Sequence, residues 1–325
     1  MGRVLLIVLD GCGAGAAPDA NRYGTSDTLA NTLSHVASAA GGLDLPNLEA
    51  LGFGNITQML GVKTCPDAKS IWGRLTERNA GKDTVAGHWE LMGIPLLEPF
   101  PTYPSGIHCD IQDLVRTFTG KQSLCNVPMS GTDAIRAFGD QHCATGAPIV
   151  YTSADSVLQV AVHEAIFGLE NLYALCASLR DNVTTCRVIA RPFSGPSGNY
   201  VRTGNRRDWT RSPGQDSVLD AIAAAGIPVE LIGRTTELFP VRETFTLNPT
   251  TKNDEHMAGV SAWLHRSNPT KRAFCFANFE DFDMLYGHRN DPIGFGRALE
   301  TLDAWIGRDL LPSLDASDIV ILTAD

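Results

Sequence analysis

Arg3-Val-Leu-Leu-Ile-Val-Leu9 is a continuous apolar run that stops at Asp10, and runs of this kind decide the fold of the chain. A second run, Ala273-Phe-Cys-Phe-Ala-Asn-Phe279, leads into three acidic residues, and a third, Ile319-Val-Ile-Leu-Thr-Ala324, stops at Asp325. Uninterrupted runs rich in β-branched and aromatic residues are typical of strands buried on both faces, as in a parallel sheet. We therefore predict an α/β fold with a mainly parallel sheet flanked by helices.

The carboxylates that follow these runs form the first candidate site. Ligands of open α/β sheets bind at the carboxyl ends of the strands, so Asp10, Asp283 and Asp325 should converge, with His288 just beyond Asp283. Taken singly, each aspartate is also compatible with a helix cap or a turn. Oxygen and imidazole ligands without thiolate suit Mn²⁺, Mg²⁺ or Zn²⁺, and two such ions can clamp a phosphoryl group during transfer.

Gly81-Lys-Asp-Thr-Val-Ala-Gly-His-Trp-Glu90 contains the candidate nucleophile. Asp83 is a good N-cap residue, so we predict a short helix that opens at Thr84, a favourable place for a phosphate. A free hydroxyl is a poor nucleophile, and metal coordination would activate it. An ordinary helix cap is the alternative, but the three strand-ending aspartates favour a metal-activated Thr84. We expect His88 to support this site rather than to bind metal.

Stretches rich in proline and glycine divide the chain into segments. Such stretches lie at residues 95–106 and 192–214, and the block between them has its own pattern of strands and helices. We predict strands at 147–153 and 186–193 and, after the second stretch, at 229–232; helices are predicted around 169–179, 217–225 and 299–310. The simplest organisation is an α/β core made of residues 1–98 and 214–325, with an inserted α+β cap domain at residues 99–213.

The predicted cap carries the one basic cluster of the chain. Its arginines are Arg191, Arg202, Arg206, Arg207 and Arg211. A solvated loop that balances charge is one interpretation. Guanidinium groups also suit bidentate binding of phosphate, which makes the cluster a candidate anion site.

Composition limits the classes of partner. The 325 residues carry a net charge of −10, which excludes a sequence-blind nucleic-acid binder because such binding needs a positive surface. The eight cysteines show no paired spacing, and Cys186 and Cys275, which lie within apolar runs, suit buried thiols in a reducing cytoplasm. The apolar N-terminal run is too short to cross a bilayer. We expect a cytoplasmic monomer with small-molecule partners and no nucleic-acid or membrane partner.

A glycine-rich segment offers a competing interpretation. Gly11-Cys-Gly-Ala-Gly-Ala16 follows a strand and fits the G-x-G-x-x-A pattern of dinucleotide binding. Asp10 would, however, direct its carboxylate toward the pyrophosphate, and no acidic residue ends a second strand about twenty positions later, as the ribose contact requires. We therefore interpret the segment as a loop of the acidic site.

Several segments together resemble phosphopentomutases, a prokaryotic branch of the alkaline phosphatase superfamily. They are Val8-Leu-Asp10-Gly-Cys-Gly-Ala-Gly-Ala-Ala-Pro-Asp19-Ala, Ser26-Asp-Thr-Leu29, Gly81 to Glu90 as quoted above, Tyr151-Thr-Ser-Ala-Asp-Ser156, and Asp281-Phe-Asp-Met-Leu-Tyr-Gly-His-Arg289. The cofactor-independent phosphoglycerate mutases share the opening strand but have a serine nucleophile in an Asn-Ser-Glu setting. The resemblance therefore favours the pentose enzymes, with an alkaline-phosphatase-like core and a cap.

The resemblance implies a mechanism and a set of site residues. Thr84 would be phosphorylated and would pass its phosphoryl group to a pentose monophosphate, interconverting ribose or 2-deoxyribose 1-phosphate and the 5-phosphates. Two Mn²⁺ ions would bind the metal ligands, which are Asp10, Thr84, Asp283, His288 and Asp325. Glucose 1,6-bisphosphate or ribose 1,5-bisphosphate would prime Thr84. Substrate contacts would come from Ser153, Asp155, Arg191 and Arg206, and from Arg234 where the family usually has lysine.

One departure from the family pattern concerns the last strand. In the family it continues through Asp-His-Gly, a Thr-Asp-His-Thr segment follows, and both histidines are metal ligands; the sequence ends at Asp325, before either. We therefore expect residues 1–325 alone to be a C-terminally truncated chain with impaired mutase activity. The alternatives are an inactive fragment that binds sugar phosphate, and a metal-dependent phosphatase or phosphodiesterase of the same superfamily.

Overall fold

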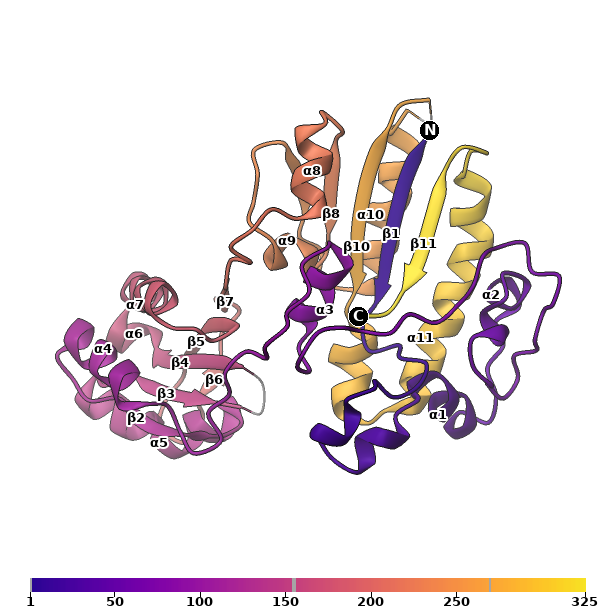
Figure 1. The fold of residues 1–325 in the computed structure, drawn as a ribbon. Helices are drawn as coiled ribbons and strands as arrows, with labels where there is room; N and C mark the ends of the chain where they lie inside the picture. The colour runs from indigo at the N-terminus through magenta and orange to yellow at the C-terminus, as the bar shows by residue number, and fades with distance from the viewer. Residues whose placement is uncertain (1, 154–155, 269) are drawn as a thin grey trace. The chain divides into compact units, whose positions relative to one another are not determined.

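The computed structural model describes residues 2–153, 156–268 and 270–325, and its chain divides into two compact units (Figure 1). The first contains residues 1–78, 87–95 and 215–325, and the second contains residues 79–86 and 96–214. This division differs from a single insertion at 99–213, because residues 79–86 cluster with the second unit before the chain returns to the first. The assignment of the units as core and cap stays a prediction.

The first unit is built on a five-stranded sheet in the order β11-β1-β10-β8-β9, in which every neighbouring pair is parallel. Its strands are β1 (Arg3–Leu9), β8 (Val229–Ile232), β9 (Phe245–Asn248), β10 (Ala273–Phe279) and β11 (Ile319–Thr323). β1 and β10 are buried along almost their whole length, as continuous apolar runs require of central parallel strands. The predicted parallel α/β sheet is therefore confirmed.

Helices cover both faces of this sheet (Figure 1). They are α1 (Thr32–Ala39), α2 (Pro46–Ala50), α8 (Val218–Ala224), α9 (Thr235–Leu238), α10 (Asn253–Arg266) and α11 (Pro292–Trp305), together with α3 (Thr84–Leu91), which begins in the second unit. Leu5 and Ile7 of β1 pack with side chains of α1, α10 and α11 in one apolar core. Phe276 of β10 faces the other side, where its ring lies 5.7 Å from the ring of His88 in α3.

The second unit has a mixed sheet in the order β2-β3-β4-β5-β6, with β7 also paired to β5. Its strands are β2 (Leu124–Pro128), β3 (Ile149–Thr152), β4 (Val157–His163), β5 (Arg187–Ser194), β6 (Val201–Arg202) and β7 (Arg207–Thr210). Its helices are α4 (Cys109–Thr119), α5 (Gly131–Thr145), α6 (Glu164–Phe167) and α7 (Leu169–Asn182). α4 and α7 pack on one face of the sheet and α5 on the other, which gives the predicted α+β arrangement.

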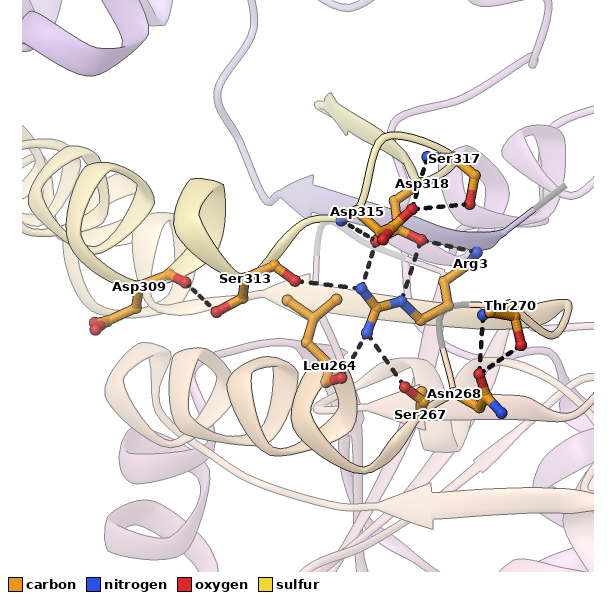
Figure 2. A network of polar contacts seen from close by, with 10 residues as sticks. All are labelled: Arg3, Leu264, Ser267, Asn268, Thr270, Asp309, Ser313, Asp315, Ser317 and Asp318. Carbon is orange, nitrogen blue, oxygen red and sulfur yellow. Dashed lines mark hydrogen bonds and ion pairs between the residues drawn. The ribbon is translucent and has the colours of Figure 1, made fainter.

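The buried Arg3 side chain anchors the amino end of β1 in the first unit (Figure 2). The Nε and Nη2 groups of Arg3 donate to the two carboxylate oxygens of Asp318 at 3.1 and 2.5 Å. Its Nη1 group also donates to the Leu264 carbonyl at 2.5 Å, and Nη2 to the Ser313 carbonyl at 3.2 Å. One guanidinium thus joins β1, the last turn of α10 and the segment before β11.

We predict that Arg3→Ala destabilises the protein strongly. The substitution leaves the Asp318 carboxylate, whose side chain is 2% exposed, without its cation. Removing one partner of a buried ion pair lowers the free energy of unfolding by about 3–5 kcal/mol. Urea denaturation measures the loss. Arg308→Ala, which removes an arginine from an ion pair with Asp309 at the surface, is the control and should leave the midpoint nearly unchanged. Equal effects of the two substitutions would contradict the assignment.

The ion pair between Arg3 and Asp318 should make the stability of the folded protein depend on pH. Burial raises the pKa of Asp318, but hydrogen bonds from Arg3 and from the Asp315 N–H outweigh it and hold that pKa below its ordinary value. The pair's stabilisation is therefore complete above about pH 4, the ordinary pKa of an aspartate, and is lost as the pH falls through the lower folded value. The stability difference between wild type and Arg3→Ala should shrink over that acidic range. A constant difference would mean that Asp318 does not carry the effect.

Candidate active site

The register of the parallel sheet brings acidic residues to one level at its carboxyl edge. Val8 pairs with Thr323 and Leu9 with Phe279, so the residues that follow, Asp10, Glu280 and Asp325, leave the sheet together. Asp10 and Asp325 each stand two positions beyond a paired residue, which directs both side chains to the same face. The convergence expected from the three apolar runs is present in the first unit.

Gly11 allows the chain to turn away immediately after Asp10. Its φ is +74°, and a Cβ at this position would lie 3.3 Å from the Cβ of Asp283. The Gly11 N–H donates to Asp325 Oδ1 at 3.2 Å. Asp283 and Asp325 therefore both lie beside the turn that follows Asp10.

Burial and electrostatic repulsion both disfavour negative charge in this cluster. Burial, then the charge and hydrogen bond of Asp325, then the charge of Asp283 raise the pKa of Asp10 far above its ordinary value, and Arg234 offsets only part of the shift. Carboxylates gathered in a buried place cannot all ionise unless a cation compensates them. The arrangement is therefore suited to a positive ligand.

A pair of buried polar side chains supports the cluster from α3 and β10. The His88 Nε2 atom lies 2.7 Å from Asn278 Nδ2, and Asn278 Nδ2 also donates to Asp10 Oδ2 at 3.4 Å. Because the Asn278 amide is the donor, Nε2 accepts, and a neutral His88 carries its proton on Nδ1. That Nδ1 atom lies 3.5 Å from Asp325 Oδ2. His88 thus orients Asp325 from behind, as a supporting residue would.

Asp281 and Asp283, which both follow β10, contact different parts of the structure. Asp283, in the π-helical turn η4 (Phe282–Tyr286), lies 3.0 Å from Nε2 of the exposed His288 in η5 (Gly287–Arg289). Asp281, by contrast, accepts the Asn253 N–H at 2.8 Å at the start of α10. Asp281 is therefore a structural residue, and Asp283 with His288 is the part of this segment that can serve a ligand.

Arg234, a predicted substrate residue, lies at the acidic edge of the first unit. It follows β8 in the first unit, and its Nη1 group lies 3.5 Å from Glu280 Oε2. Arg191, Arg206 and Ser153 belong to the second unit. Sequence alone had grouped these residues as one substrate set.

Thr84 is the first residue of α3, as predicted. The Oδ1 atom of Asp83 accepts the Val85 N–H at 2.8 Å, which is the bond of an N-cap. The buried Cys186 thiol, one residue before β5, donates to the same oxygen at 3.3 Å. Farther along α3, a Cβ at Gly87 would lie 3.1 Å from the Cβ of Asp325. One helix therefore carries the candidate nucleophile and the residues that pack against Asp325.

Three arginines of the basic cluster, Arg191, Arg202 and Arg206, lie near Tyr151 on the α5 face of the second unit's sheet, whereas Arg207 lies over the rings of Tyr173 and Trp209. The Nε group of Arg191 in β5 donates to Gln159 Oε1 in β4 at 3.0 Å. Burial, followed by repulsion from Arg206, lowers the pKa of Arg191 to about 10. Arg206 donates from Nε and Nη2 to the two oxygens of Asp208 at 2.7 and 2.6 Å. Ser153 is half-buried just after β3, and Asp155 lies outside the described residues.

The donor set fits a divalent metal by its chemistry. Carboxylate oxygens and an imidazole are ligands that Mn²⁺ and Mg²⁺ accept, and the raised pKa of Asp10 shows that the group lacks positive charge. Within the described residues, however, no three His, Cys, Asp or Glu side chains form a group that could hold a metal ion. The structure therefore shows converging acidic side chains that do not enclose a metal position within the described residues. Among the residues that the structure describes, no helix is long and apolar enough to cross a membrane.

Comparison with known proteins adds independent information. The model of the Metalloenzyme superfamily matches residues 2–325. A phosphopentomutase of Syntrophotalea carbinolica is 45% identical over 327 aligned positions, which cover 99% of this chain and 82% of that protein. Phosphopentomutases of Caldanaerobacter subterraneus subsp. tengcongensis and Acetivibrio thermocellus are each 42% identical, with 99% and 100% of this chain and 81% and 83% of those proteins covered.

We predict that Asp10→Asn stabilises the protein when divalent ions have been removed by chelation. The amide keeps the shape of the side chain and removes one of the repelling charges. Since the folded pKa of Asp10 is raised, its contribution to stability is full below the ordinary aspartate range and is lost as the pH rises through the raised value. The gain in the thermal midpoint should therefore be present at neutral pH and vanish near pH 4, the ordinary range of an aspartate.

The same substitution should weaken the response to added Mn²⁺. Wild type should gain thermal stability on titration with the ion, and Asp10→Asn should gain much less because a ligand oxygen has lost its charge. Asp281→Asn is the matched control: it weakens the cap of α10 and so lowers the midpoint, but it should keep the metal response. An undiminished response of Asp10→Asn would exclude Asp10 as a ligand.

Proposed function

The chain belongs to the phosphopentomutase family of the Metalloenzyme superfamily, a family of divalent-metal-dependent isomerases, and from this membership we propose how its residues act. Thr84 accepts a phosphoryl group and returns it to the substrate, so that the phosphate of ribose or 2-deoxyribose moves between C1 and C5. The observation that carries the proposal is that α3 opens at Thr84 and, one turn later, holds His88 against Asp325.

The acidic residues of the first unit, with Thr84, are proposed to serve the phosphoryl group that is transferred. Asp10, Asp283, His288 and Asp325, together with Thr84 Oγ1, would hold two divalent ions, which we propose to be Mn²⁺. When bound, the ions neutralise charge on the phosphoryl oxygens and favour the ionised threonine oxygen. The positive end of the α3 dipole would stabilise the phosphate carried by Thr84. His88 and Asn278 keep Asp325 and Asp10 in place, and positioning supplies much of the rate.

Arg234 and Glu280 adjust the charge at the acidic edge. The ion pair between them lies at 3.5 Å, and the positive charge of Arg234 lowers the pKa of Asp10. We propose that Arg234 also contacts an anionic group of the bound substrate, since its charge already reaches the acidic cluster. Lysine would supply the same charge without the planar fork of guanidinium.

The second unit recognises the phosphate that is not transferred. Arg191 is held by Gln159, so its guanidinium is oriented before a ligand arrives. Arg206 would exchange Asp208 for the phosphate or bind it beside that carboxylate. Ser153 and Asp155 are proposed to contact the sugar. A cytoplasmic monomer primed by glucose 1,6-bisphosphate or ribose 1,5-bisphosphate completes the proposal.

We predict that treatment with glucose 1,6-bisphosphate places one phosphate on Thr84. Intact-mass analysis and peptide mapping should locate it there, and Thr84→Ala should abolish both the modification and the mutase activity. Thr301→Ala is the control, since this hydroxyl bonds within α11 to the Arg297 carbonyl. A phosphate on another residue, or an active Thr84→Ala enzyme, would sink the assignment. Release of inorganic phosphate from ribose 5-phosphate as the main reaction would favour a phosphatase instead.

The basic cluster gives a second test. Arg191→Ala and Arg206→Ala should each weaken ribose 5-phosphate binding about 10-fold or more, because each removes hydrogen bonds to a charged group. Metal content should not change, since neither arginine lies in the acidic cluster. Arg207→Gln is the control: Arg207 packs over the rings of Tyr173 and Trp209, and its strand neighbour Ala190 places it on the opposite face of the sheet from Arg191. Calorimetry measures the affinities, and unchanged binding by both alanine variants would contradict the proposed role.

A further inference from the structure

The amino end of α5 in the second unit is an unusual meeting point of hydrogen-bond donors. This helix begins at Gly131, and its N-cap Ser130 accepts the Asp133 N–H at 3.2 Å. The other N–H groups of a first helical turn have no partner within the helix and carry its positive dipole end. The hydroxyl of Tyr151 is a further polar group at this helix end.

Tyr151 of β3 is fully buried, but its hydroxyl has no hydrogen-bond partner among the described residues. A Cβ built on Gly131 would collide with Tyr151 Oη and with Arg202 Nη2. Both polar groups therefore lie directly over the first residue of α5, and only glycine leaves them room. A buried hydroxyl without a partner is costly, so its retention calls for a ligand or another function.

Arg202 adds a cation at the same place. Its guanidinium makes no hydrogen bond or ion pair within the described part of the chain, although β6 pairs its backbone with Phe193 in β5. Arg191 and Arg206 are close as well: burial raises the pKa of Tyr151, and the charges of these three arginines act in the opposite direction. The one acidic residue in the first turn, Asp133, is already bonded to Ser130 Oγ and to Arg136.

The polar groups that meet at the amino end of α5 are hydrogen-bond donors. A hydroxyl, a guanidinium and the N–H groups of a helix end all offer protons, and an anion with several oxygens satisfies them together. We propose that the amino end of α5, Tyr151 Oη and Arg202 form an oxyanion subsite that completes the phosphate site of Arg191 and Arg206. The inference rests on the proposed function: the anion is the phosphate of the pentose phosphate that is not transferred.

The decisive variant is Tyr151→Phe, because it separates binding from folding. Removing a hydroxyl that has no hydrogen-bond partner among the described residues should leave the thermal midpoint unchanged or raise it. The same change should weaken ribose 5-phosphate binding about 10-fold, since a hydrogen bond to a charged group is lost. Arg202→Gln should act in the same direction, and Gly131→Ala should reduce binding by filling the subsite. Arg207→Gln, on the other face of the sheet, is the matched control.

Calorimetry with ribose 5-phosphate, and with ribose as the uncharged probe, distinguishes the outcomes. Weaker ribose 5-phosphate binding by Tyr151→Phe with an unchanged or higher midpoint supports the subsite. A lower midpoint would show that the hydroxyl makes a structural bond and would overturn it. Full affinity in Tyr151→Phe and Arg202→Gln, with loss in Arg191→Ala, would overturn the subsite and leave the proposed function standing. If Arg191→Ala and Arg206→Ala also kept full affinity for ribose 5-phosphate, the proposed phosphate site itself would be ruled out.

Discussion

Repulsion among buried carboxylates is the constraint on which the first unit depends. Parallel pairing of β11, β1 and β10 delivers Asp10 and Asp325 to one level of the sheet, and the turn at Gly11 brings Asp283 beside them. These charges cannot move apart without disrupting the pairing of β11 with β1 and of β1 with β10; β1 and β10 are buried, whereas β11 is a partly exposed edge strand. The apolar packing of α10 and α11 against β1 therefore holds the acidic groups together, and the crowding of carboxylates suits this edge to a cation.

α3 couples this edge to the candidate nucleophile. His88 contacts Asn278 and approaches Asp325, while Gly87 removes the Cβ that would press on Asp325. Thr84 lies one turn earlier in the same helix. Its hydroxyl therefore cannot move along the helix axis unless Gly87 and His88 move with it. A glycine inside a helix costs about 1 kcal/mol relative to alanine, and the close approach to Asp325 gives that cost a structural reason.

The sequence predicted those parts of the site that follow from strand and helix signals. Each of β1, β10 and β11 is a continuous apolar run, so the carboxylates after them were visible, and Asp83 marked the start of α3. Contacts between distant segments were not visible. Asn278 looks like an interruption of an apolar run until β10 is placed beside α3, and Arg234 joins Glu280 only through the order of the strands. Periodicity reports local structure, whereas these pairings depend on the tertiary fold.

The two units solve opposite electrostatic problems. In a chain with net charge −10, the first unit concentrates carboxylates and the second concentrates guanidinium groups around Tyr151. A phosphate approaching the acidic edge alone would be repelled, so its binding there requires a cation. The cluster of Arg191, Arg202 and Arg206 already carries positive charge and can bind a phosphate without metal. Under the proposed function, recognition and transfer would fall to different groups: the arginines of the second unit would bind the sugar phosphate without metal, and reaction at Thr84 would require that the acidic edge be neutralised.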